Sequence, residues 1–139
     1  MEQNQKPLFV IDPYPTVDWP VIVKLAADGG SFEEYQFTAK IRVLSPSEYE
    51  ALSAVKAGDS EPTWQEILSD NARKFSELVV GWDGPTDPDG NAVPFTPEVL
   101  AAQVIGPHGL ALSAGLWKAV NEIRFGERLK NSVPLPGAG

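Results

Sequence analysis

The sequence contains no cysteine and only one histidine, His108. The lack of cysteine excludes disulfides, zinc–thiolate sites and cysteine nucleophiles, and it fits a reducing compartment. One histidine cannot build a zinc site without cysteine, and no acidic residue flanks His108 to orient it as a general base. We therefore expect His108 to be a surface residue at the start of a helix.

Long hydrophobic runs are missing too. No stretch of about 18 apolar residues occurs, and residues 1–7 lack the basic and apolar regions of a signal peptide. The sequence therefore predicts a cytoplasmic protein that does not cross a membrane.

Basic residues are scarce relative to acidic ones. The chain has 11 Lys and Arg against 19 Asp and Glu, which gives a formal net charge of −8. Such a charge repels a phosphate backbone, so nucleic acid is not an expected partner. The acidic residues are spread evenly along the chain, which favours a solvated, self-repelling surface over a concentrated acidic patch that mimics DNA.

The motifs of common catalytic and nucleotide-binding sites are also absent from the sequence. It has no Gly-x-Ser-x-Gly elbow, no Gly-x-Gly-x-x-Gly and no phosphate-binding Gly-x-x-x-x-Gly-Lys-Ser/Thr loop. A Ser-His-Asp triad would have to use His108. We therefore predict that the protein is not an enzyme and binds no cofactor.

Three aspartates, Asp83, Asp87 and Asp89, invite a calcium-loop interpretation because hard cations prefer clustered oxygen ligands. Their spacing does not fit an EF-hand, since the first and twelfth positions of such a loop would fall on Pro85 and Thr96. We expect these aspartates to form turns and expect no metal site.

What the chain does contain is the pattern of one α+β domain over residues 1–130. Leu8-Phe9-Val10-Ile11-Asp12 could form a short strand that ends at the following prolines. Residues 19–26 and 35–44 alternate apolar and polar side chains around a Gly-rich turn, which predicts an antiparallel hairpin with one buried face. Residues 131–139, rich in Pro, Gly and Ala, are expected to be a disordered tail.

Four helices are expected after this hairpin. Ser45 and Thr63 each precede a glutamate by three residues, the spacing of a capping box, and they predict helices over about 46–57 and 64–80. Thr96-Pro97 predicts a third helix, and the last is expected over about 108–125. The apolar positions of the last helix are Leu112, Leu116, Trp117, Val120 and Ile123.

Residues 81–100 form the most unusual stretch of the sequence. They are too rich in Gly, Pro and Asp for a helix or a central strand, yet they carry Trp82, Val93 and Phe95 as apolar anchors. A long connection in a small domain is usually functional or disordered, and three anchors argue against disorder. We expect this loop to fold back on the domain.

The order of motifs in this region resembles a known family. Gly81-Trp82-Asp83-Gly84 is followed by Asp87-Pro88-Asp89-Gly90, then by Val93-Pro94-Phe95-Thr96-Pro97, a proline-interrupted final helix and Lys130-Asn131. This order resembles that of tail assembly chaperones of long-tailed bacteriophages. The resemblance covers about residues 64–131.

The resemblance implies that the protein coats a long tape-measure protein before tail tube subunits polymerise around it. The expected partners are the tape-measure protein, with the tail tube protein and another copy of the chain as further candidates. As a hypothesis, Trp82 and Phe95 hold the loop, and the helix face bearing Leu116 and Trp117, or the hairpin edge, contacts the partner. Alternatives are a small regulatory or antitoxin-like binding protein and a small hydrolase that uses His108.

Overall fold

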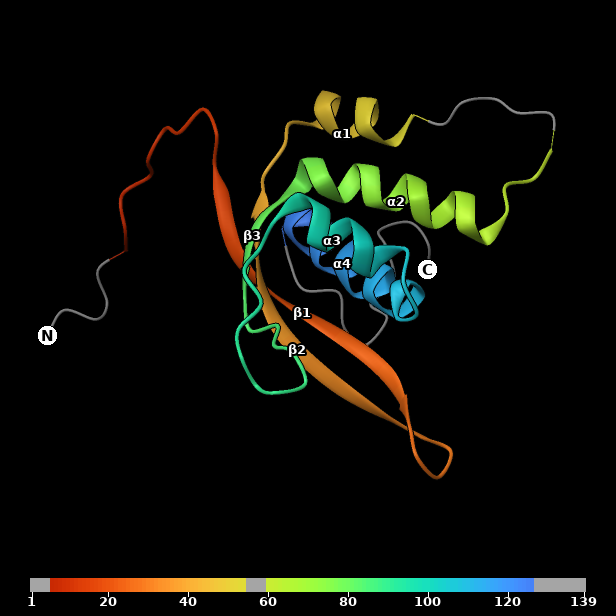
Figure 1. Cartoon of the computed structure of the whole chain (residues 1–139). Coiled ribbons are helices and arrows are strands. Elements are labelled where there is room, and N and C mark those ends of the chain that lie inside the picture. The colour runs from red at the N-terminus through yellow and green to blue at the C-terminus, as the bar shows by residue number, and fades with distance from the viewer. Residues whose placement is uncertain (1–5, 55–59, 127–139) are drawn as a thin grey trace, which may run out of the picture.

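The computed structural model describes residues 6–54 and 60–126. It has the expected α+β architecture, in which an antiparallel three-stranded sheet carries helices on one face (Figure 1). The elements, in chain order, are β1 Thr16–Ala27, β2 Ser31–Arg42, α1 Pro46–Ser53, α2 Trp64–Leu78, β3 Val79–Asp83, α3 Pro97–Val104 and α4 Gly109–Phe125. The predicted helix residues 55–57 and the predicted tail lie outside the described residues.

The predicted hairpin is confirmed as β1 and β2. The two strands pair along twelve residues each, and Gly29 and Gly30 close the turn with φ of 85° and 84°. Positive φ at both positions is cheap only for glycine, which explains the Gly-Gly sequence. The inward side chains alternate with outward ones as expected, and the fully buried ones are Val21, Ala39 and Ile41.

The third strand differs from the sequence prediction. Residues 8–12 form no strand, whereas residues 79–83, which we expected to end a helix and begin a loop, form β3 beside β2. Val79 already has an extended backbone, with φ of −100° and ψ of 124°, and its side chain is buried. Two β-branched residues, Val79 and Val80, favour this early change from helix to strand.

The helix starts agree with the predicted capping. Ser45 Oγ accepts a hydrogen bond from Glu48 N at 3.2 Å, and Glu48 Oε1 accepts one from Ser45 N at 2.8 Å. Thr63 and Glu66 form the same reciprocal pair, with distances of 3.1 and 2.7 Å. The hydrogen bonds from the Ser45 backbone and side chain hold the pKa of Glu48 below its usual value.

Helix α4 makes the closest approach to the hairpin. A Cβ atom placed on Gly115 would lie 2.3 Å from the backbone oxygen of Ile22 in β1, so only glycine fits at this crossing. The next residue, Leu116, is fully buried in the core with Phe75, Leu78 and other side chains of α2 and the sheet. The same core includes Leu100 and Val104 of α3, which lies beside α2 and α4 (Figure 1).

This close crossing predicts the effect of adding one methyl group. We expect Gly115→Ala to lower the free energy of unfolding by about 2 kcal/mol, because overpacking outweighs the gain in helix propensity. The control Ala114→Ser, at an exposed position of the same helix, is expected to change it by less than about 0.5 kcal/mol. Urea denaturation measures both variants, and a Gly115→Ala protein as stable as the unaltered chain would contradict the crossing.

Candidate protein-binding surfaces

The loop between β3 and α3 is held to the domain by Trp82. Its indole ring lies edge-on between two phenyl rings, with centroid distances of 6.1 Å to Phe37 and 5.2 Å to Phe95. The indole Nε1 donates a hydrogen bond to the backbone oxygen of Val93 at 2.8 Å. Trp82 and Phe95 thus pack against the core, as expected of apolar anchors, whereas the contact shown for Val93 is through its backbone oxygen.

The aspartates of this loop form a turn. Asp87 Oδ1 accepts hydrogen bonds from the backbone N–H groups of Asp89 at 2.9 Å and Asn91 at 3.0 Å. Gly90, with φ of 85°, closes the turn by donating a hydrogen bond from its backbone N–H to the backbone oxygen of Asp87 at 2.9 Å. Within residues 6–54 and 60–126, no group of three or more His, Asp or Glu side chains is arranged to hold a metal ion.

The predicted partner-binding residues of the last helix lie inside the domain. Leu116 is 0% exposed, so the face that carries it covers the sheet and is not open to a partner in this fold. Trp117 is half-buried, with its ring 4.6 Å from that of Phe75 and its Nε1 donating to Asn71 Oδ1 at 3.3 Å. Trp82 and Phe95 are half-buried as well. A binding role for these four residues stays a prediction, and their contacts give them a structural one.

His108 lies where the sequence placed it. It is the exposed N-cap residue of α4, and its side chain makes no capping hydrogen bond.

Exposed apolar side chains lie where α2 begins and where α3 is followed by α4. Trp64, the first residue of α2, is 67% exposed. One turn further, Leu68 packs against Gly109 at the start of α4, next to the exposed Leu110. We call Trp64, Leu110 and the exposed Ile105 of the α3–α4 turn the helix-end patch.

Two other groups of apolar side chains are exposed elsewhere. Leu8, Phe9, Val10 and Ile11 are 75–90% exposed and precede β1, on the side of the molecule from which the N-terminal segment extends (Figure 1). Near the turn of the hairpin, Phe32 and Tyr35 of β2 are 63% and 53% exposed. The alternation in residues 35–44 predicted that Tyr35 lies on the buried face of the hairpin. Tyr35 does lie on that face, but at a part of the strand that the helices do not cover.

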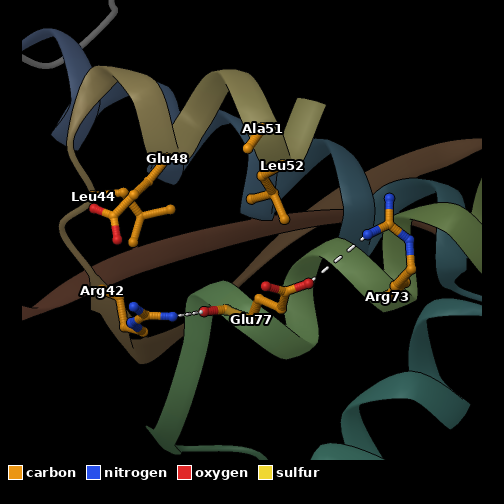
Figure 2. A pocket seen from close by; sticks show the side chains of 7 residues that line it. All are labelled: Arg42, Leu44, Glu48, Ala51, Leu52, Arg73 and Glu77. Carbon is orange, nitrogen blue, oxygen red and sulfur yellow. Dashed lines mark hydrogen bonds and ion pairs between the residues drawn. The ribbon is translucent and has the colours of Figure 1, made fainter. Parts of the chain in front are cut away.

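A polar hollow of about 250 Å³ separates α1 from α2 (Figure 2). Its charged side chains pair with groups of the domain itself. Arg42 Nη1 donates to the backbone oxygen of Glu77 at 2.9 Å, and Arg73 Nη1 lies 3.8 Å from Glu77 Oε2. The Arg42 contact joins the end of β2 to α2, and the Arg73–Glu77 ion pair lies within α2.

The chain was compared with protein-family models, curated proteins and solved structures, and none of them matches it. Among the described residues, no single helix is long and apolar enough to cross a membrane. Helices α3 and α4 reach that length and composition only as a pair, and the two are bent by 117°.

The packing around Trp82 predicts how the loop responds to its removal. We expect Trp82→Ala to lower the free energy of unfolding by about 2–3 kcal/mol, less than for a fully buried tryptophan because the ring is half-buried. The amide of Val93, which donates to Pro85 at 2.9 Å, should also lose protection from hydrogen exchange.

Trp64→Ala is the matched control, because it removes an exposed indole and is expected to cost no more than about 0.5 kcal/mol. Denaturant titration and amide exchange distinguish the two variants. Unchanged protection of Val93 in Trp82→Ala would show that the indole does not hold the loop.

Proposed function

We propose that this protein is a tail assembly chaperone of a long-tailed bacteriophage, which binds the tape-measure protein in the host cytoplasm and keeps it soluble while the tail tube assembles. It acts by covering apolar surface on another polypeptide and has no catalytic residues. The observation that carries the proposal is the order of motifs from Gly81 to Pro97, together with the way these motifs fold.

The fold gives each of these motifs a physical task. The Trp82 side chain fixes the corner between β3 and the loop, Asp87 forms the acidic turn, and Phe95 returns the chain to the domain beside Trp82. Thr96 then caps α3 by accepting a hydrogen bond from Val99 N at 3.0 Å. A run of residues that forms one continuous structural unit supports a family resemblance better than scattered identities would.

The helix-end patch is the surface that fits an apolar helical segment best. Trp64 is a large, rigid anchor of the kind that dominates protein interfaces, and Ile105 and Leu110 add aliphatic surface where α3 is followed by α4. A tape-measure protein is a long helical chain with apolar surface, so an anchor of this kind can mask part of it. The net charge of −8 would keep coated complexes apart.

The proposal predicts capture of the tape-measure protein through the helix-end patch. We expect the unaltered chain, co-expressed with the very long protein encoded beside it, to keep that protein soluble and to purify with it. The double variant Trp64→Ser/Leu110→Ser is expected to weaken capture at least about tenfold, since two exposed apolar anchors are lost.

Gln65→Ser, at the exposed position next to Trp64, is the matched control and should bind normally. Circular dichroism and urea denaturation establish that all variants are folded. If the folded, unaltered chain fails to bind the long protein, the chaperone proposal is rejected. A small regulatory protein from the same neighbourhood purifying in its place would favour the antitoxin-like alternative.

A further inference from the structure

The N-terminal segment Leu8–Ile11 has the sequence of a strand, but it pairs with no strand in the part of the chain that the structure describes. All four side chains are apolar, so both faces of the segment are apolar when it is extended, as in a strand buried on two sides. Pro7 and Pro13 bracket it, and β1 begins only at Thr16. The four side chains are 75–90% exposed. We call these four residues the arm.

Among the described residues, no strand lies on the outer side of β1, and β3 covers only part of the outer side of β2. Along each strand of an antiparallel pair, the backbone N–H and C=O groups of one residue hydrogen-bond to the partner strand, and those of the next residue point away from it. Val43 N donates a hydrogen bond to Pro15 O at 2.9 Å. The backbone groups of the odd-numbered residues of β2 therefore face β1, and those of the even-numbered residues face away from β1. Strand β3 pairs with β2 only from Thr38 to Ile41. Among the described residues, no strand pairs with the outward backbone groups of Phe32 and Glu34.

This edge, residues 32–35, matches the arm in length and in the character of its side chains. Both segments are four residues long. Phe32 and Tyr35 lie on opposite faces of the two-stranded ribbon and are both more than half exposed. A strand added beside residues 32–35 would place side chains against both aromatic rings. Because the two rings lie on opposite faces, the added strand needs apolar residues on both of its faces. The arm provides them, whereas a strand with one polar face would not.

The arm cannot reach this edge in its own copy. Glu34 pairs with Lys24, nine residues along β1 from Pro15, a distance of about 30 Å at 3.3 Å per residue. Leu8 is seven residues from Pro15, and seven residues span at most about 25 Å. The arm also extends away from the end of the hairpin that carries the free edge (Figure 1). An arm that pairs with residues 32–35 must therefore come from another molecule.

We propose that the arm of one copy adds as a strand to residues 32–35 of a second copy. The backbone groups of both segments then become paired, and the exposed apolar side chains of each cover those of the other. Each copy carries one arm and one edge, so the contact joins two different surfaces. It requires no tape-measure protein, and its test succeeds or fails independently of the proposed function.

The test begins with the mass of the full chain in solution. One copy has a mass of 15.0 kDa. Analytical ultracentrifugation of the unaltered chain, from about 1 μM to 1 mM, is expected to show an average mass that rises above one copy with concentration. The arm variant Phe9→Ser/Val10→Ser should stay at one copy over this range. The edge variant Glu34→Pro should do the same, because proline removes the outward N–H group of that position.

Mixing the two variants gives the decisive result. The arm variant keeps its edge and the edge variant keeps its arm, so an equal mixture should form one-to-one pairs although each variant alone does not associate. Thr16→Ser, at an exposed position of β1, is the control and should associate like the unaltered chain.

Three outcomes would overturn the proposal: an unaltered chain that stays at one copy throughout, an arm variant that still associates, or a folded mixture that forms no pairs. The arm variant changes only side chains at least 75% exposed, so it keeps the proposal testable even if Glu34→Pro does not fold. In that case Phe32→Pro, at the other outward position of the edge, replaces Glu34→Pro in the mixture.

Discussion

The contact between α4 and the β-hairpin is the constraint on which the rest of the structure depends. A two-stranded ribbon is unstable in water unless one of its faces is covered. Helix α4 covers it closely, because Gly115 brings the helix backbone against Ile22 and Leu116 fills the space beside it. Trp19 of β1 adds a polar contact, with its Nε1 donating to Glu122 Oε1 of α4 at 2.8 Å. The sheet, α2 and α3 then pack around this pair.

This contact also determines which surfaces remain for a partner. The apolar side of α4, including Leu116 and Trp117, is used within the domain, and Trp82 and Phe95 are used to hold the loop. Groups of exposed apolar side chains lie elsewhere: in the arm, at the end of the hairpin and in the helix-end patch. Exposed apolar groups of this size are typical of interaction sites, and we propose the helix-end patch for a partner polypeptide and the arm and hairpin edge for further copies of the chain.

Local signals in the sequence predicted most of the elements. The alternation of apolar and polar residues in 35–44 predicted which face of β2 is buried. The spacing of Ser45 to Glu48 and of Thr63 to Glu66 predicted where two helices begin. These signals succeed because the physical cause lies within a few residues of the feature. The Gly-Gly turn belongs to the same class.

Features that depend on distant parts of the chain could not be predicted in this way. Val79 continues the apolar stripe of α2, and only the availability of β2 as a neighbour makes it the start of a strand. Residues 8–12 have strand-like composition, but a strand needs a partner and none of the described residues pairs with them. The burial of Leu116 depends on the glycine next to it meeting β1, and the exposure of Trp64 depends on where neighbouring helices end.

The central claim is that the protein works by presenting apolar surface to another polypeptide. Amide hydrogen exchange of the chain, alone and mixed with the tape-measure protein, tests it most directly. The account predicts added protection at the start of α2 and in the α3–α4 turn, around Trp64, Ile105 and Leu110. Protection confined to the acidic turn at Asp87, or no change anywhere in a folded chain, would contradict it.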